Sequence, residues 1–239
     1  ILLSNLALSP DLVILNSEIK DKQLIKILRP SFLKIKNDRS YFKKDFENFF
    51  VDIADYLSFF GGVVIKKSVW DSRNKTNYFG TRFLHVGVIL QKYFQNNIKV
   101  IAQPLISIRY GNASWSAQSF YYSLIVWPNL IWSFDDISDT AKKQVCNKDF
   151  SKSLFTLILY RARGSYSVDE YNKYFKDLFS QYSIIKYFSY LIALFPGYFL
   201  NSILYINLFF SCDRKLRFLN LYISSFYIID NNNLSPFGK

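Results

Sequence analysis

The chain has 239 residues but no methionine, only one histidine and only two cysteines. Methionine is missing even at position 1, and the apolar residues that open the chain resemble the interior of a helix. We therefore expect this sequence to be a piece of a longer protein. Residues 1–15 also lack the basic segment and the small-residue cleavage site of a secretory signal, which argues against reading this apolar start as one.

The two cysteines, Cys146 and Cys212, lie far apart and do not have the spacing of metal ligands. This pattern argues against a cysteine metal cluster and favours a reducing compartment. The single histidine, His85, is the only imidazole in the chain that can serve as a base near neutral pH.

The charge is strongly positive, with 30 Lys and Arg against 18 Asp and Glu and a net charge of +12. Such a charge favours anionic partners, namely nucleic acid, acidic lipid headgroups or phosphorylated substrates. The basic residues are scattered, and no block of about five or six like charges forms a nucleic-acid-binding arm. Because aromatic residues reach 19% and Ile, Lys and Asn are abundant, part of the basicity reflects an A/T-rich coding sequence. We expect no nucleic-acid partner.

The first half of the chain alternates between apolar runs of strand length and segments with helical spacing. Strands are predicted at residues 11–16, 63–67 and 99–110, and helices before Pro10, at 42–57 and at 83–90. Pro104 indicates an edge position or a bulge in the last of these strands. The alternation predicts an α/β fold.

From residue 112 onward the pattern is helical throughout. Gly164 is predicted as the C-cap of a helix at 149–163, and Ser167 and Glu170 are predicted to form a capping box. Residues 187–212 carry no charge and are flanked by basic residues, while Pro196-Gly197 predicts two short helices that meet at a kink. We interpret them as helices that lie in a membrane interface; a buried hairpin and a membrane span are the alternatives.

Three segments, at residues 61–71, 78–89 and 103–115, carry a recognisable set of residues in a fixed order. The set comprises Lys66-Lys67, Trp70, Tyr78, Gly80-Thr81, His85, Arg109, Gly111 and Asn112. In this order and spacing they resemble the second half of family-2 glycosyltransferases, specifically the abequosyltransferase-like enzymes of O-antigen assembly. The resemblance covers residues 1–115 well and the helical remainder only loosely.

The resemblance implies an incomplete GT-A-type, Rossmann-like domain at residues 1–115 and a helical, membrane-associated tail at 116–239. The full enzyme would transfer a sugar from a nucleotide-sugar donor to an undecaprenyl-diphosphate-linked acceptor, at the cytoplasmic face of the bacterial inner membrane. A divalent metal, Mg²⁺ or Mn²⁺, would be held by an acidic motif in the nucleotide-binding half, which this sequence lacks. The acidic residues at 134–139 are read as a solvated helix start, and we expect this piece alone to be inactive.

Relatives place a Glu-Asp pair at the start of the helix that we expect to begin at Gly80, where this chain has Thr81-Arg82. His85, one turn further, becomes the candidate general base or a ligand to the nucleotide-bound metal. The alternative is a core histidine that is hydrogen-bonded to a backbone carbonyl. Asp71 is a reserve candidate for the base, although a turn residue is the stronger interpretation.

The substrate-binding candidates are Thr81, Arg109, Asn112 and Trp115. Arg109, at a predicted strand end, suits a phosphate or a sugar hydroxyl, and the alternative is a surface arginine paired with a neighbouring helix. Thr81 is predicted to bind a substrate hydroxyl or to cap the helix. Trp115 is a candidate for stacking on a sugar, whereas Trp127 and Trp132 are expected in the core.

Two other functions remain open from the sequence. One is a basic RNA-associated protein, which needs clustered Lys and Arg with exposed stacking aromatics. The other is a non-catalytic module that binds a membrane surface.

Overall fold

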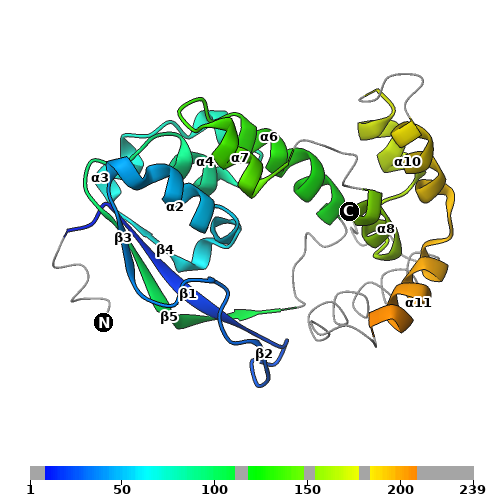
Figure 1. Ribbon diagram of the computed structural model, residues 1–239, viewed down its shortest axis with the longest axis horizontal. Helices are drawn as coiled ribbons and strands as arrows, with labels where there is room; N and C mark the ends of the chain where they lie inside the picture. The colour runs from blue at the N-terminus through cyan, green and yellow to red at the C-terminus, as the bar shows by residue number, and fades with distance from the viewer. Residues whose placement is uncertain (1–8, 111–117, 148–153, 178–183, 209–239) are drawn as a thin grey trace, which may run out of the picture. The chain divides into compact units, whose positions relative to one another are not determined.

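The computed structural model describes residues 9–110, 118–147, 154–177 and 184–208 (Figure 1). The chain divides into two compact units. Unit 1 comprises residues 1–110 and 126–147, and unit 2 comprises residues 111–125 and 148–239.

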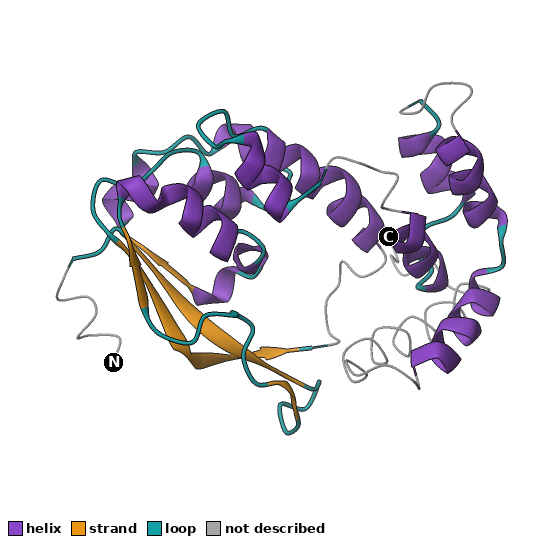
Figure 2. Ribbon diagram, viewed as in Figure 1, coloured by secondary structure: helices purple, strands orange, loops and turns teal. Residues whose placement is uncertain are grey.

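Unit 1 contains a curled, mixed sheet (Figure 2). Its strands are β1 (Leu12–Lys20), β2 (Ile27–Arg29), β3 (Arg39–Tyr41), β4 (Val63–Ile65) and β5 (Ile98–Arg109). β1 runs parallel to β5 on one side and antiparallel to β4 and β2 on the other, while β3 pairs antiparallel with the start of β5. The predicted α/β class and the three predicted strands are confirmed, with the first strand longer than the pattern indicated.

Helices cover one face of this sheet (Figure 1). They are α2 (Phe46–Ile53), α3 (Lys67–Asp71), α4 (Leu84–Leu90), α6 (Trp127–Trp132) and α7 (Asp139–Val145). Phe49, Phe50 and Ile53 of α2 are fully buried in the same core as Leu12 and Ile14 of β1. These strand residues alternate with Val13, which packs with Leu15 and Ile101 in a separate buried cluster. The near-continuous apolar sequence of β1 reflects burial on both faces.

The predicted helix at 42–57 is shorter than its apolar spacing indicated. α2 ends at Ile53, and two 3₁₀ turns follow, η2 (Tyr56–Ser58) and η3 (Phe60–Gly62). The Tyr56 hydroxyl donates to the backbone carbonyl of Leu15 in β1. This hydrogen bond holds the buried Tyr56 side chain against the sheet just after α2 ends.

Residues 126–147 also differ from the expected boundary, because they pack in unit 1 and not with the helical remainder of the chain. Leu130, Ile131, Phe134 and Ile137 are buried in the core that α2 and α4 share. A purely helical pattern cannot show which layer a helix joins, since that depends on the surface it covers.

Pro104 indicated an edge position or a bulge, and a register shift is present in β5. Leu15 of β1 pairs with Ile101, but Ser17, two residues on, pairs with Ile106. Buried Asn16 lies at this register shift, and its amide nitrogen donates to the Ala102 carbonyl (2.6 Å) and to the Ser31 hydroxyl (2.8 Å). Its oxygen accepts from the backbone N–H of Ser17 (2.8 Å) and of Leu33 (2.9 Å). One side chain thus satisfies the backbone that the bulge removes from the ladder.

Unit 2 is helical in its described residues, as predicted. It contains α5 (Ser119–Tyr121), α8 (Leu154–Ala162), α9 (Val168–Glu170), α10 (Ile184–Leu194) and α11 (Gly197–Leu208), with the π-helical turn η8 (Tyr171–Phe175). The π-helical turn η6 (Tyr122–Val126) also begins in unit 2, and its last residue belongs to unit 1. Its core is largely aromatic and centres on Phe120, Tyr166 and Phe175. Gly164 adopts φ 74° just after α8, which confirms the predicted C-cap.

The capping box at Ser167 is not formed as predicted. The Ser167 hydroxyl oxygen accepts from the backbone N–H of Asp169 at 3.1 Å instead of that of Glu170. The hydroxyl itself donates to the Glu170 carboxylate at 2.5 Å. Ser167 still caps the helix. The Glu170 carboxylate, however, accepts from the Ser167 hydroxyl and not from the Ser167 backbone N–H.

The kink predicted at Pro196-Gly197 is confirmed. α10 and α11 meet there at an angle of 93°. Among the described helices, no single one is long and apolar enough to span a bilayer. Only the bent pair, taken together, has the length and hydropathy for this. Gly197 lies directly on the end of α8, because a Cβ atom there would be 2.8 Å from the Arg161 carbonyl oxygen. Arg161 also donates from Nε to the Phe195 carbonyl (2.7 Å), which ties the kink to α8.

Replacing Asn16 tests how far the sheet depends on it. Asn16→Ala leaves two buried N–H groups and one half-buried carbonyl without their partner, and we expect it to lower the free energy of unfolding by about 2–4 kcal/mol. Urea unfolding followed by tryptophan fluorescence measures this, since Trp70, Trp127 and Trp132 all lie in unit 1. Asn48→Ala, at an exposed position of α2, is the matched control and should change stability little. Equal effects of the two variants would contradict this assignment.

Candidate functional site

His85 lies in the first turn of α4 and is half-buried. Its Nε2 atom is 2.5 Å from the carbonyl oxygen of Leu57, and because a carbonyl only accepts, Nε2 carries the proton. The ring meets Phe60 edge-on, with centroids 5.9 Å apart. This is the backbone-bonded arrangement that the sequence left open as the alternative. Nδ1 is the remaining nitrogen, and the catalytic role of His85 stays a prediction.

Burial lowers the pKa of His85 below its ordinary value of 6.5, and the hydrogen bond to Leu57 opposes this only in part. The imidazole is therefore neutral at neutral pH. A neutral ring is the form that both a general base and a metal ligand require.

Arg73 holds the other end of the helix that carries His85. Its guanidinium is buried and donates from Nη1 to the carbonyls of Val88 (2.8 Å) and Ile89 (2.6 Å) in the last turn of α4. The group also lies over the Phe94 ring, with its central carbon 4.0 Å from the ring centroid. Burial lowers the pKa of Arg73 to about 10, so the side chain keeps its charge at neutral pH. A cation at a helix C-terminus is favourable, and it fixes the position of α4.

Thr81 does not start the helix as predicted. α4 begins at Leu84, four residues after Gly80, and Gly80 itself adopts φ 78°. The Thr81 hydroxyl donates to the Tyr78 carbonyl (2.7 Å) in the preceding 3₁₀ turn, η4 (Thr76–Tyr78), so it closes this turn and does not cap α4. The positive φ of Gly80 breaks the run and delays the helix. A contact between Thr81 and substrate stays a prediction.

Tyr78 explains the glycine inside α4. A Cβ atom at Gly87 would lie 2.2 Å from the Tyr78 ring, so the ring packs directly on the helix backbone. Both residues lie between residues 78 and 89, and their shared role is close packing.

Arg109 is the last residue of β5 and is exposed beside Lys20, its partner in β1. Within the described part of the chain, no hydrogen bond or ion pair links Arg109 with Thr81 or His85. Lys66 lies at the opposite end of β1, with its Nζ 3.5 Å from the Asp11 carboxylate. Nine strand residues separate these two ends, which corresponds to about 30 Å. The basic pair at the end of β4 and Arg109 therefore cannot bind one small group together.

The other sequence candidates fall into two sets. Asn112 and Trp115 lie outside the described residues. Asp71 is exposed in α3, where its carboxylate is 3.9 Å from Lys67 Nζ, and no base function follows from that position. Trp127 and Trp132 pack against the main core, as expected, and Trp132 Nε1 donates to the Cys146 carbonyl (3.0 Å).

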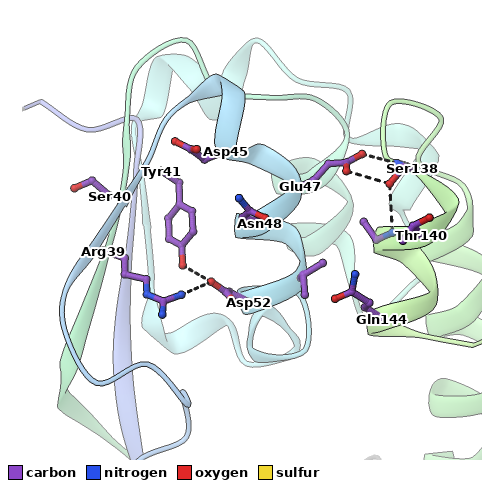
Figure 3. Close-up of a pocket in the computed structure, with 12 residues that line it drawn as sticks. Arg39, Ser40, Tyr41, Asp45, Glu47, Asn48, Asp52, Ser138, Thr140 and Gln144 are labelled. Atoms are coloured by element: carbon purple, nitrogen blue, oxygen red, sulfur yellow. Dashed lines mark hydrogen bonds and ion pairs between the residues drawn. The ribbon is translucent and has the colours of Figure 1, made fainter.

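A polar pocket in unit 1 was not predicted from the sequence. It has a volume of ≈ 550 Å³ and lies between β3, α2 and α7 (Figure 3). Its lining residues are Arg39, Ser40, Tyr41, Asp45, Glu47, Asn48, Val51, Asp52, Ser138, Thr140, Ala141 and Gln144. These positions read as ordinary solvent-facing residues of separate segments. Only the packing of α7 beside α2 assembles them, so the sequence carries no signal for this pocket.

Two hydrogen-bonded groups shape the walls of the polar pocket. Asp52 Oδ2 accepts from Arg39 Nη1 and from the Tyr41 hydroxyl, both at 2.7 Å. Burial, followed by the hydrogen bond to Asp52, raises the pKa of Tyr41 to about 12, so its hydroxyl remains a donor. Across the pocket, the Glu47 carboxylate accepts from the Ser138 backbone N–H (2.8 Å) and from its hydroxyl (3.0 Å).

Over the residues that the structure describes, no three His, Cys, Asp or Glu side chains are grouped as metal ligands. The carboxylates of the polar pocket are instead engaged with Arg39, Tyr41 and Ser138.

Comparisons with protein-family models, with curated proteins and with solved structures give no match to this chain.

The single histidine makes a clean test of its environment. Because the folded state lowers the pKa of His85, the unfolded chain binds more protons between the two pKa values. Stability should thus be complete above about pH 6.5, the unfolded value, and should fall as the pH drops through the lowered folded value. We expect His85→Gln to remove this part of the pH dependence.

Urea midpoints at about pH 7.5 and pH 5.5 measure this difference. Gln95→Ala, at an exposed polar position, is the control and should keep the wild-type pH dependence. Wild-type stability that is flat or rises as the pH falls over this range would show that the imidazole is not buried as a neutral group.

Proposed function

We propose that this chain is the C-terminal part of an inverting family-2 glycosyltransferase of surface-polysaccharide synthesis. The observation that carries the proposal is the ordered set of motif residues, together with the elements in which they occur. The described parts of the three motif segments lie in consecutive elements of unit 1, namely β4 with α3, then α4, then β5. An α/β layer of this kind, with a central strand parallel to its long neighbour, supports a GT-A-type origin for the fold.

The reaction of such an enzyme requires a base for the acceptor hydroxyl and positive charge near the leaving diphosphate. His85 is the candidate base, because its ring is neutral at neutral pH. Nε2 donates to Leu57, so the proton would be accepted by Nδ1. A divalent metal, Mg²⁺ or Mn²⁺, would be supplied with the nucleotide-binding half.

The acceptor in this proposal is linked to undecaprenyl diphosphate, so the enzyme would work at the cytoplasmic surface of the membrane. The bent pair of α10 and α11 supports this setting. Its outward side chains are mainly aromatic or aliphatic, and Tyr187, Tyr198 and Phe199 are 62%, 62% and 55% exposed. Their sequence carries no charge from residue 187 to 212, whereas the chain as a whole has a net charge of +12. Apolar faces with a basic background are typical of helices bound to anionic lipid surfaces.

The coding DNA upstream of Ile1 gives the first test of catalysis. We expect an in-frame extension with a nucleotide-binding βαβ pattern and an acidic metal motif. The extended protein should transfer sugar from a nucleotide-sugar donor to a polyprenyl-diphosphate-linked acceptor, and His85→Ala should lower kcat by about 10²–10⁴-fold. Asp71→Asn is the control and should retain activity.

His85→Gln separates chemistry from packing in the same assay, since a glutamine amide can also donate to the Leu57 carbonyl but cannot act as a base. Full activity in this variant would remove His85 from the catalytic groups. The absence of any nucleotide-binding extension in the gene would reject the glycosyltransferase proposal itself.

Membrane binding is testable with the chain in hand. We expect it to co-sediment with vesicles that contain phosphatidylglycerol, less strongly at high salt. Replacing two exposed aromatics by Phe188→Ser and Phe199→Ser should weaken partitioning at least about tenfold, because each ring loses its burial in lipid. Phe42→Ser removes an exposed ring in unit 1 and is the matched control. Unchanged binding of the double variant would reject α10 and α11 as the contact.

A further inference from the structure

An exposed apolar tip lies on the hairpin that joins β1 to β2. The loop of this hairpin comprises residues 21–26, and Figure 1 shows it at one end of the sheet of unit 1. Ile25 in the loop is 81% exposed, and Ile27, the first residue of β2, is 48% exposed. Among the large apolar side chains that the structure describes, none is more exposed than Ile25. We call residues 21–27 the hairpin tip.

Asp21 holds the hairpin tip in one conformation. Its Oδ1 atom accepts from the backbone N–H groups of Ile25 (2.8 Å) and Lys26 (3.2 Å). Its own N–H donates to the Lys26 carbonyl and its carbonyl accepts from the Leu24 N–H, both at 3.0 Å. Ile25 is therefore presented to the solvent by a hydrogen-bonded turn. Because the turn is already ordered, a partner that covers Ile25 does not have to order it.

Leu24 adopts a backbone conformation that is unfavourable for a leucine. Its φ is 62°, in the left-handed region that glycine and asparagine tolerate better than other residues do. Either of those residues would close the same turn with less strain. The leucine instead adds a third apolar side chain to the hairpin tip. The loop thus has an apolar character that its conformation does not require.

Basic side chains accompany this apolar tip. Lys22 and Lys26 are exposed within the loop, and Arg109 is exposed at the adjoining end of β5. Glu18 opposes these charges only in part, since its carboxylate is 2.8 Å from Lys20 Nζ. Binding to an anionic lipid surface increases with the apolar area that enters the lipid and with the basic residues near the headgroups. The hairpin tip supplies both.

A second protein chain fits the hairpin tip less well. β2 is an edge strand, but it has only three residues and is followed by Pro30, so the addition of another strand there is restricted. A stable protein interface covers about 800 Å² on each partner, which is more than two isoleucine side chains provide. A lipid surface can close around a small protruding tip, and the observations therefore favour a membrane over a protein.

We propose that the hairpin tip of unit 1 inserts into an anionic membrane surface, with Ile25 and Ile27 among the lipid chains and Lys22 and Lys26 at the headgroups. This contact is additional to the one assigned to α10 and α11 in the proposed function, and it involves residues of unit 1 alone. It does not rest on glycosyl transfer, so each of the two proposals can fail without the other.

A fluorescent label at the hairpin tip tests insertion directly on the full chain. Ile25→Cys, in a background of Cys146→Ser and Cys212→Ser, accepts one environment-sensitive dye. With phosphatidylglycerol vesicles, we expect its emission to shift to the blue, because the dye leaves water for lipid. Gln95→Cys, an exposed position shortly before β5 begins, is the control and should stay unshifted. An unshifted label at position 25 overturns the proposal, even where the chain binds vesicles through α10 and α11.

Unlabelled variants separate the apolar and the charged contributions. Ile25→Ser with Ile27→Ser should weaken partitioning to phosphatidylglycerol vesicles about tenfold, because two apolar side chains lose their burial in lipid. Lys22→Gln with Lys26→Gln should also weaken it about tenfold, but should leave binding to phosphatidylcholine vesicles unchanged. Phe42→Ser, which removes an exposed ring next to β3, is the matched control. The exposed positions keep the fold intact, which circular dichroism verifies.

Sedimentation equilibrium of the same proteins tests the other occupant, a second copy of the chain. We expect the wild type and the Ile25→Ser, Ile27→Ser variant to have the same oligomeric state. A wild-type dimer that this variant converts to a monomer would make the hairpin tip an interface between copies and overturn the proposal. Unchanged partitioning of both double variants to phosphatidylglycerol vesicles has the same consequence.

Discussion

The sheet of unit 1 depends on the hydrogen bonds of one buried side chain, Asn16. β1 and β5 are parallel over most of their length, but β5 contains extra residues around Pro104, and the ladder loses register there. Unpaired backbone groups in a buried sheet are costly, and Asn16 satisfies them on both sides of β1. Through Leu33 and Ser31 it also fixes the loop between β2 and β3. β3, which follows this loop, forms a wall of the polar pocket.

A second constraint fixes α4 and the histidine it carries. Arg73 binds the carbonyls at the end of this helix, and His85 binds the Leu57 carbonyl near its start. Tyr78 packs on the backbone at Gly87 between them. These three contacts hold the helix firmly against the turns that follow α2. In the proposed enzyme, this support would hold the His85 imidazole in a fixed orientation. It also stabilises a helix of only seven residues, which is too short to be stable by itself.

In unit 2, side chains that donate to backbone carbonyls also join neighbouring helices. Arg161 and Asn201 donate to the carbonyls of Phe195 and Ala162, so polar contacts join α8 to the kink and to α11. The apolar side chains of α10 and α11 are in large part left outside. In a helix pair surrounded by water, such apolar side chains would usually be buried between the two helices. Their exposure supports the lipid contact in the proposed function. The two units thus carry separate parts of the proposal, catalysis and membrane attachment.

The amino-acid pattern by itself determined the α/β class, the strands at β1, β4 and β5, the C-cap at Gly164 and the kink at Pro196-Gly197. At Pro104 it indicated an edge position or a bulge, and the structure has the bulge. Each of these follows from local rules, namely apolar period, a missing N–H group or a positive φ. Only the tertiary structure decided that α7 packs beside α2 and that His85 binds Leu57. The polar pocket belongs to this second group. Its walls are more than 90 residues apart at Glu47 and Ser138, and long-range packing of this kind leaves no periodic trace in the chain.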